Sequence, residues 1–301
     1  MNNKKIISIG IPAYNEERVL GRLLDSLRMQ SIYSSMVKEV IIEIDGSTDN
    51  TYEIASIYKA INPQIKVYRG RLRRGKSSRL NHILRTFKGE ILVLIDSDVT
   101  LASKNTLKNL ILPILYGKTD LTYGSKEYKS IEKSIVSHIS ITREKIWRAM
   151  RDTLNNGNNI YNCSGSFTAL SKKYSNLLNF PKKISSDNQY IYLNALSNKI
   201  MPRFIKNAIV HAYPTSNLSD FISQNIRLRD EFSPMLEIFG NKYLSEYKLP
   251  LIAKWQAMLT QLIKNPVLGL YAVLFDLLIK FYPGNHNNHL WEIANTTKDL
   301  I

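Results

Sequence analysis

An uninterrupted apolar run that ends in two aspartates, at residues 91–98, constrains the fold more than any other feature of the chain. Residues 91–95 are apolar at every position and rich in β-branched side chains, which is typical of a strand buried on both faces of a sheet. Asp96 and Asp98 follow that run directly. Open α/β sheets bind their ligands beyond the carboxyl ends of the strands. The sequence therefore predicts a polar site at the end of a central strand.

Asp96 and Asp98 have two interpretations. Neighbouring carboxylates repel each other and raise each other's pKa unless a cation lies between them. Their hard oxygen atoms suit Mg²⁺ or Mn²⁺, which commonly complete their coordination with substrate phosphates. The alternative is a polar loop that caps the next helix, with Asp98 or Thr100 as the N-cap residue. Residues 96–98 alone do not decide between a metal site and a helix cap.

The first hundred residues alternate between strand and helix patterns. Expected strands cover residues 6–12, 40–44, 65–68 and 91–95, the first and the last with the composition of a buried strand. Expected helices cover residues 16–29, with Asn15 as the N-cap, 51–60 and 80–87. This alternation predicts an α/β fold with a mostly parallel sheet and right-handed crossovers.

The second half of the chain is less regular and ends in two apolar segments. Strands are expected at residues 121–124 and 167–170, and helices at residues 131–154 and 188–196. The apolar segments are residues 250–264 and 266–282. The second is short for a membrane-spanning helix, which needs about 20 apolar residues, and it contains Asp276 and Lys280. We expect the pair to lie in a membrane interface, the alternative being a buried helical hairpin.

The charge balance favours polyanionic partners. The chain has 41 Lys and Arg residues against 25 Asp and Glu, a formal net charge of +16. Nucleic acid, an anionic membrane surface and phosphorylated substrates all match this charge. The basic residues are spread along the chain instead of forming a stripe with aromatic residues, so we expect no nucleic-acid partner. A single cysteine, Cys163, excludes an internal disulfide and fits a reducing compartment. No secretory signal is expected, because residues 14–17 interrupt the first apolar run.

Four motifs occur in a characteristic order. They are Ile-Pro-Ala-Tyr-Asn-Glu at residues 11–16, Asp-Gly-Ser-Thr-Asp-Asn-Thr at 45–51, Arg-Gly-Lys at 74–76 with Leu-Asn at 80–81, and Asp-Ser-Asp at 96–98. Together they resemble the family-2 inverting glycosyltransferases, closely over about the first 100 residues and more loosely over residues 101–230. The resemblance implies a GT-A fold, a Rossmann-like α/β architecture. We expect a nucleotide-sugar-binding half at residues 1–100, an acceptor-binding half at 101–232 and a helical, partly apolar extension at 233–301.

The resemblance also implies a set of donor-binding residues. Asp45 would accept a hydrogen bond from the nucleobase, although an Asx-turn is the alternative for this residue. The individual arginines of the loop at residues 71–76 are interpreted as solvated. The remaining expected contacts are Pro12, Ala13, Tyr14 and Glu16 to the base and ribose, Asp96 to the ribose or a metal-bound water, and Lys76 and Arg227 to the diphosphate.

Metal and catalytic residues follow from the same resemblance. Asp98, with Asp96, would hold Mn²⁺ or Mg²⁺ against the diphosphate and so stabilise the leaving nucleotide. His211, just after an expected strand at residues 208–210, would complete the metal shell or lie near the phosphate, although a surface histidine is the alternative. The family's catalytic base belongs to an acidic pair before a later helix, and in residues 184–190 only Asp187 remains of it. Asp187 would accept the proton of the acceptor hydroxyl, with a helix N-cap as the alternative.

Two further segments bear on the acceptor. Gly165 and Ser166 resemble the small-residue loop beneath the acceptor sugar. Gln224 to Arg227 resembles the beginning of the Gln-x-x-Arg-Trp motif of membrane-bound members, but Leu228 replaces the tryptophan, which argues against a processive role.

These observations lead us to expect a metal-dependent inverting glycosyltransferase that uses a UDP- or GDP-sugar and a lipid-linked or glycan acceptor. We expect it to be cytoplasmic and peripheral at the inner face of the cell membrane. A sugar-phosphate nucleotidylyltransferase is one alternative, but its glycine-rich signature is missing after the first expected strand. A non-enzymatic polyanion-binding protein and an inactive scaffold are the others.

Overall fold

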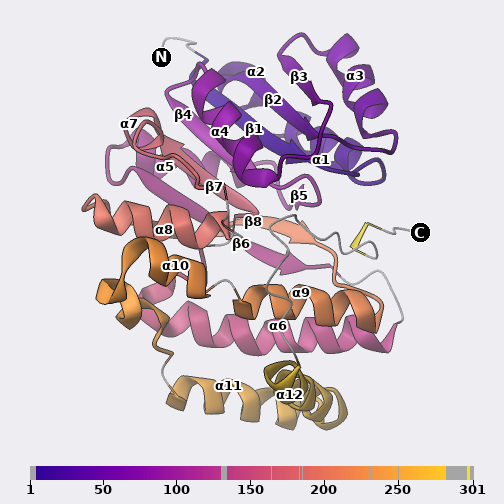
Figure 1. The fold of residues 1–301 in the computed structure, drawn as a ribbon, viewed down its shortest axis with the longest axis vertical. Helices are drawn as coiled ribbons and strands as arrows, with labels where there is room; N and C mark the ends of the chain where they lie inside the picture. Colours follow the sequence, from indigo (N-terminus) through magenta and orange to yellow (C-terminus); the bar gives the residue numbers. More distant parts are fainter. Residues whose placement is uncertain are drawn as a thin grey trace.

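A single curled sheet passes through the centre of the protein (Figure 1). The computed structural model describes residues 5–129, 134–163, 165–182, 184, 186–230, 232–249, 251–282 and 297–298. Within these residues the sheet has eight strands in the order β3-β2-β1-β4-β7-β6-β8-β5. The strands are β1 (Ile7–Ala13), β2 (Val37–Asp45), β3 (Ile65–Gly70), β4 (Ile91–Ile95), β5 (Thr100–Leu101), β6 (Leu121–Tyr128), β7 (Phe167–Ser171) and β8 (Arg203–Ala212).

The first four expected strands form the parallel part of this sheet. β1 pairs with β2 on one side and β4 on the other, and β2 pairs with β3, always in parallel. Alternate residues of β4 pack into two different hydrophobic cores, one on each face of the sheet, because successive side chains of a strand point to opposite faces. Val93 packs with α1 (Leu20–Arg28) and α3 (Thr51–Ile61), whereas Leu92 packs with α4 (Lys76–Thr86). The expected α/β fold with a mostly parallel sheet is confirmed.

The second half of the chain extends the same sheet with mixed strand directions. β7 is antiparallel to both β4 and β6, and β5 is antiparallel to β8. The start of β7 therefore lies beside the end of β4, where the Asp96 amide donates a 3.2 Å hydrogen bond to the Ser166 carbonyl. Strand direction thus places the expected acceptor loop next to the expected donor carboxylates.

Three local expectations about helix ends and strand ends were wrong. Asn15 does not cap α1, which begins at Leu20; Asn15 has a positive φ of 52° and its side chain accepts a hydrogen bond from the Thr48 amide. Asp187 is the first residue of α8 (Asp187–Ser197), and the N-cap is Ser186, whose hydroxyl accepts from the Gln189 amide. His211 lies inside β8 rather than after it. Asn15 is thus used by a tertiary contact, and Ser186 takes the capping position that was considered for Asp187.

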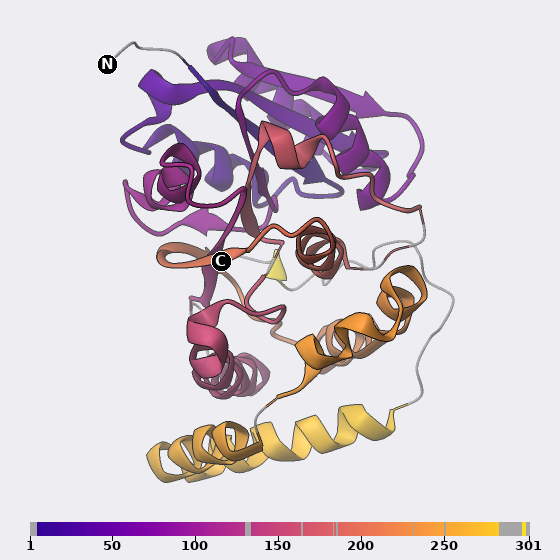
Figure 2. The ribbon, with the colours of Figure 1, turned by 90° about the vertical axis from the view of Figure 1, so that its left-hand side faces the viewer.

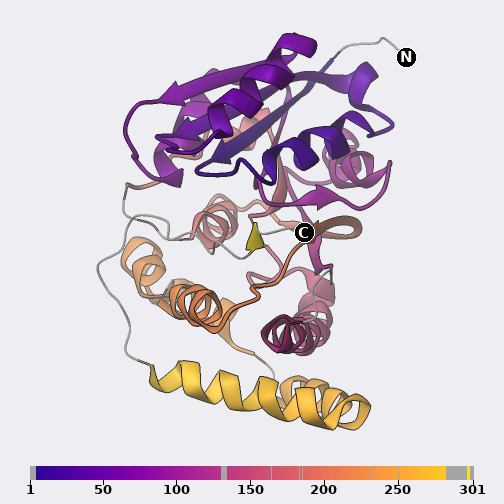
Figure 3. The same ribbon diagram turned by 90° about the vertical axis from the view of Figure 1, so that its right-hand side faces the viewer.

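Helices form two further layers below the sheet (Figures 1, 2 and 3). α6 (Ile135–Thr153) and α9 (Leu218–Asp230) lie between the sheet and an outer hairpin of α11 (Leu251–Lys264) and α12 (Pro266–Phe281). Other elements are α2 (Tyr33–Met36), α5 (Thr106–Leu115), η1 (Leu154–Gly157), α7 (Lys172–Ser175), α10 (Phe232–Phe239) and η2 (Asn241–Tyr247). Among the described helices, none has the length and apolar character required to cross a membrane.

Candidate functional site

A cavity of about 570 Å³ opens beyond the carboxyl ends of β1 and β4. This volume lies within the range of small-molecule sites. Its walls come from the loop after β1, the end of β4, β6, α9 and residues 297–298. Six residues expected from the sequence line it, namely Tyr14, Glu16, Asp96, Asp98, Ser166 and Arg227. Segments that are far apart in the sequence therefore meet at the edge of the sheet where a ligand site was expected.

Lys76 connects the expected donor carboxylate to the expected base. Its Nζ donates a 2.6 Å hydrogen bond to Asp96 Oδ1 and lies 3.1 Å from Asp187 Oδ2. Burial alone would lower the pKa of Lys76, but Asp187 and Asp96 together raise it above its ordinary value. The ammonium is therefore fully protonated and holds both carboxylates in one cluster. The sequence motifs assigned Lys76 to the diphosphate and contained no sign of this bridge.

The Asp98 carboxylate suits a divalent cation. Burial raises the pKa of Asp98, and the nearby Asp96 charge raises it further. No hydrogen bond or ion pair to this carboxylate occurs among the residues that the structure describes. A cation between Asp96 and Asp98 would favour their ionised forms. The described ranges hold no cluster of three or more His, Cys, Asp or Glu with metal-binding geometry, so phosphate and water oxygens would have to complete the shell.

His211 is not brought to this cluster. Its neighbour Ala212 lines the cavity, and successive residues of a strand point to opposite faces. The His211 backbone pairs with Thr100 on β5 and Glu127 on β6. Burial lowers the pKa of His211, and its Nδ1 has no hydrogen-bond partner within the described part of the chain. A metal contact by this histidine stays a prediction.

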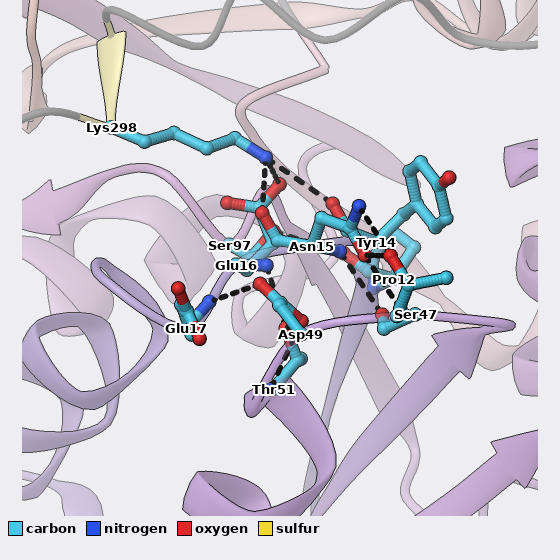
Figure 4. A network of polar contacts seen from close by, with 11 residues as sticks. Pro12, Tyr14, Asn15, Glu16, Glu17, Ser47, Asp49, Thr51, Ser97 and Lys298 are labelled. Atoms are coloured by element: carbon cyan, nitrogen blue, oxygen red, sulfur yellow. Dashed lines mark hydrogen bonds and ion pairs between the residues drawn. The ribbon is translucent and has the colours of Figure 1, made fainter.

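The side chains of Tyr14 and Glu16, in the loop after β1, line the cavity. Figure 4 shows the polar contacts of this loop. The Arg73 guanidinium lies 4.1 Å from the centre of the Tyr14 ring, a cation–π contact. The interpretation of the arginines as solvated is therefore wrong for Arg73, although Arg71 is exposed. Glu16 is only 5% exposed, and its Oε2 has no hydrogen-bond partner among the described residues. Burial raises the pKa of Glu16 to about 8, even though an adjacent lysine ammonium acts in the opposite direction.

Asp45 orders the loop that precedes α4. Its carboxylate accepts hydrogen bonds from the Arg74 amide at 2.8 Å, the Gly75 amide at 2.7 Å and Arg79 Nε at 2.7 Å. These donors are about 30 residues away in sequence, so Asp45 does not make the Asx-turn that was its alternative role. Asp45 is not among the cavity-lining residues, and its contact with a nucleobase stays a prediction.

Pro12 and Ala13 are buried within β1 and support the end of β4. The Pro12 carbonyl accepts a 3.2 Å hydrogen bond from the Ser97 hydroxyl. Ala13 is 1% exposed and belongs to the sheet core. Neither residue lines the cavity, and their contact with a base or ribose stays a prediction.

Gly165 leaves room for the start of α8. A Cβ at this position would lie 1.5 Å from Asn188 Oδ1 and 2.8 Å from Asp187 Oδ2. Burial raises the pKa of Asp187, partly opposed by Lys76 and reinforced by Asp96. A carboxylate with a raised pKa is a better proton acceptor than an ordinary one. The absence of a side chain at Gly165 therefore allows Asp187 to lie beside it, a relation that the separate motifs did not reveal.

Sequence reasoning missed several cavity residues. Lys126 and Tyr128 on β6 line the wall, with the Lys126 ammonium 5.5 Å from the centre of the Tyr128 ring. Tyr128 contributes most to a raised pKa of Lys126, and Glu144 and Asp98 add to it against the effect of burial. On α9, Gln224 of the Gln-x-x-Arg segment, to which no contact was assigned, joins Arg227 on one helix face, as their spacing allows. No local signal marks Lys126, because its position depends on strand pairing.

The family comparison agrees with this geometry. The model of the family described as glycosyl transferase family 2 matches residues 8–178, more than half of the chain. Among curated proteins, the dolichyl-phosphate beta-glucosyltransferase ALG5C of Trichomonas vaginalis is 28% identical over 141 residues, which are 45% of this chain and 35% of that protein. The glucosyl-3-phosphoglycerate synthase of Mycobacterium tuberculosis is 31% identical over 116 residues, 38% of this chain and 35% of that protein. The matches thus span about a third of the length of these two relatives.

A solved structure shows the same fold over most of the chain. The mannosyltransferase PcManGT of Pyrobaculum calidifontis, in complex with GDP-Man and Mn²⁺, has a TM-score of 0.61 at 18% identity, covering 90% of this chain and 75% of that one. This likeness concerns the fold alone, and it confirms the GT-A architecture. The motifs, the sheet and the family match agree, and the chain belongs to glycosyl transferase family 2.

Proposed function

We propose that this protein transfers a sugar from a UDP- or GDP-sugar to an acceptor hydroxyl, with inversion at the anomeric carbon and with a bound Mn²⁺ or Mg²⁺. The observation that carries the proposal is the Lys76 bridge, which brings Asp96 and Asp187 to one ammonium beside the cavity. A donor carboxylate and a proton acceptor are thereby adjacent. The relatives described as glucosyltransferase and as glucosyl-3-phosphoglycerate synthase support this reaction class.

The cavity charges suit a nucleoside diphosphate. Arg227 and Lys126 contribute positive charge from α9 and β6, opposite the carboxylates of Asp96 and Asp98. Asp96 and Asp98 would hold the divalent cation, which supplies positive charge to the leaving diphosphate when bound. Arg227 Nε is buried without a hydrogen-bond partner in the described ranges, so a phosphate oxygen would satisfy it. The Mn²⁺ and GDP-Man of the Pyrobaculum calidifontis complex support such a donor.

Asp187 is assigned as the base in this reaction. The acceptor hydroxyl must lose a proton as its oxygen attacks the anomeric carbon, and Asp187 Oδ accepts that proton. Attack from the side opposite the leaving diphosphate produces inversion. Gly165 leaves room for the side chains of Asn188 and Asp187, and Ser166 lines the cavity next to Asp96. We assign both small residues to the acceptor side.

Thermal stability tests the donor assignment directly, because a ligand that binds only the folded state raises the melting temperature. Melting is measured with UDP, GDP and their sugars, each with and without Mn²⁺. We expect a metal-dependent rise with one nucleotide, and we expect Asp98→Asn to lose the metal dependence. Asp25→Asn, an exposed aspartate on α1, is the matched control. If intact protein shows no rise in melting temperature with any of these nucleotides, the proposal is contradicted.

The α11–α12 hairpin favours a membrane-associated acceptor. Its inward positions carry small residues, with Ala257 and Ala272 against Ile146 of α6, and Gly269 against Leu262. Large apolar side chains face outward instead, namely Ile252, Trp255, Leu259, Ile263, Val267, Leu270, Leu277, Leu278 and Phe281. Water-soluble helices normally show the opposite arrangement. The hairpin is also the outermost layer, on the side away from the sheet (Figures 2 and 3).

We assign an anionic phospholipid surface as the partner of this apolar face. Lys264 and Lys280 are exposed at the helix ends beside the apolar side chains, and the whole chain has a net charge of +16. Helices with this combination lie in the membrane interface, and each lysine near an anionic surface adds to the attraction. A lipid-linked acceptor would then be held at the same surface as the enzyme.

Liposome sedimentation tests the membrane assignment. We expect the protein to sediment with phosphatidylglycerol vesicles and less with phosphatidylcholine vesicles. Replacing Trp255 and Phe281 together by serine should abolish sedimentation, whereas Ile57→Ser, at an exposed position on α3, should not. If the unaltered protein stays in the supernatant with anionic vesicles, the membrane assignment is wrong. A stable dimer that is lost in the hairpin variant would identify a second copy as the partner instead.

A further inference from the structure

Lys298 contacts a loop that lies 282 residues earlier in the sequence (Figure 4). Its Nζ donates hydrogen bonds to Glu16 Oε1 at 2.7 Å, to the Asn15 carbonyl at 2.7 Å and to the Tyr14 carbonyl at 3.2 Å. A lysine ammonium has three protons, so each of them has an acceptor on residues 14–16. Lys298 is 9% exposed. The contact is buried and complete, unlike a typical surface ion pair.

The conformation of residues 14–16 depends on such support. Asn15 has a φ of 52°, a left-handed conformation that is unfavourable for most residues other than glycine, although asparagine adopts it more readily than most. Its amide donates to the Ser47 hydroxyl at 3.0 Å, and its side chain accepts from the Thr48 amide at 2.9 Å. Lys298 adds a third constraint through the Asn15 carbonyl. Strained residues of this kind persist where several contacts determine them together, commonly beside functional sites.

The buried Glu16 carboxylate depends on a neighbouring cation more strongly than the Asn15 backbone does. It is 5% exposed, and Lys298 is its ion-pair partner. A buried carboxylate without a cation is strongly unfavourable and becomes protonated or moves. Lys298 opposes the burial effect that raises the pKa of Glu16. Removing this lysine would therefore change both the charge and the position of the Glu16 side chain.

Residues 14–16 also present the groups that would meet a ligand. The Tyr14 ring lines the cavity with Arg73 stacked on it. Glu16 Oε2 lacks a hydrogen-bond partner in the described structure, while Oε1 is held by Lys298. A ribose hydroxyl is a donor of suitable size for Oε2. Lys298 thus fixes one oxygen of Glu16 and leaves the other for the ligand.

We propose that Lys298 is a positioning residue for the nucleotide-sugar donor, because it holds residues 14–16 in the shape that binds the nucleoside. This proposal rests on the proposed function, since it assumes a nucleotide-sugar in the cavity. All three protons of the ammonium are used by the loop. Lys298 therefore acts through Tyr14 and Glu16 instead of contacting the diphosphate, and it has no part in the proton transfer at Asp187.

Steady-state kinetics with separate donor and acceptor titrations test this role. Lys298→Met keeps the length of the side chain without its charge, and we expect it to raise the donor KM about tenfold. The acceptor KM and kcat should change less than about twofold, because the base and the acceptor side are untouched. Lys298→Arg should recover most of the donor affinity, because a guanidinium can still pair with Glu16. Lys145→Met, at an exposed position on α6, is the matched control.

Each outcome has a distinct meaning. An unchanged donor KM in Lys298→Met would overturn the proposal, and tighter donor binding would show that Lys298 obstructs the site. If Lys298→Met does not fold, Lys298→Gln removes the charge, keeps a polar side chain and leaves Glu16 unaltered, and it should raise the donor KM in the same way. If the unaltered protein binds no UDP- or GDP-sugar, the proposed function fails together with this role. If it binds one and the variants bind it equally well, only the role of Lys298 fails.

Discussion

The strand β4 and the helix α12 are both strongly apolar, yet they place their side chains in opposite environments. All five residues of β4 are buried, and they pack against helices on both faces of the sheet. α12 instead buries Gly269, Ala272 and Ile279 and leaves Leu278 62% exposed. Apolar composition therefore has two uses in this molecule. In the sheet it stabilises the fold beneath a polar site, and in the hairpin it forms a contact surface.

The largest difference between these regions concerns catalysis. Asp187 and Asp276 each pair with a basic residue, Lys76 and Arg143 respectively. We expect Asp187→Asn to lower the transfer rate by about 10²- to 10⁴-fold without weakening donor binding, because proton acceptance is lost while Lys76 keeps its hydrogen bond to Asp96. Asp276→Asn in the hairpin should keep transfer to a soluble acceptor. Single-turnover transfer and donor binding measure the two effects, and full transfer by Asp187→Asn would refute the base assignment.

A matched pair of leucines separates folding from surface contact. Leu92 in β4 is 0% exposed, whereas Leu278 in α12 is 62% exposed. Leu92→Ala should lower the free energy of unfolding by about 2–5 kcal/mol, because it removes apolar contacts and leaves a cavity. Leu278→Ala should change it by less than about 0.5 kcal/mol. Urea denaturation measures both, and a large loss in Leu278→Ala would mean that the hairpin face is covered in the folded protein.

A third expected effect, small within any single pH unit, is a pH dependence that belongs to the sheet region. Burial raises the pKa of Glu16 to about 8 in the folded protein, above the value of an ordinary glutamate. The folded state therefore holds a proton that the unfolded state has lost between about pH 4.5 and 8. Stability must fall as pH rises through this window, by at most about 1.4 kcal/mol per pH unit.

Glu16→Gln removes this group and should flatten the decline, as measured by urea denaturation at several pH values. Leu278→Ala in the hairpin should keep the slope of the unaltered protein, because it changes no ionisable group. An identical slope in Glu16→Gln and the unaltered protein would show that Glu16 remains ionised throughout.

Much of the donor half was predictable, because its signals are local. The apolar runs of β1, β2, β3 and β4 and the intervening helices follow from short-range periodicity. The polar residues after β1 and β4 were expected at the same edge, since parallel strands end together. Asp96, Asp98 and Glu16 do line one cavity. The helix caps were less predictable, because the Asn15 side chain instead accepts a hydrogen bond from the Thr48 amide in another loop.

The sequence by itself determined the order of strands and helices in the donor half, the family motifs and the carboxylates at the end of β4. Each of these features depends on residues that are close together in the sequence, so short-range patterns are enough to predict it. Only the tertiary structure decided that Lys76 joins Asp96 to Asp187, that Lys126 enters the cavity and that Lys298 holds Glu16. It also decided which face of α12 points outward. Such contacts join distant segments, and their geometry results from packing the whole chain around one sheet.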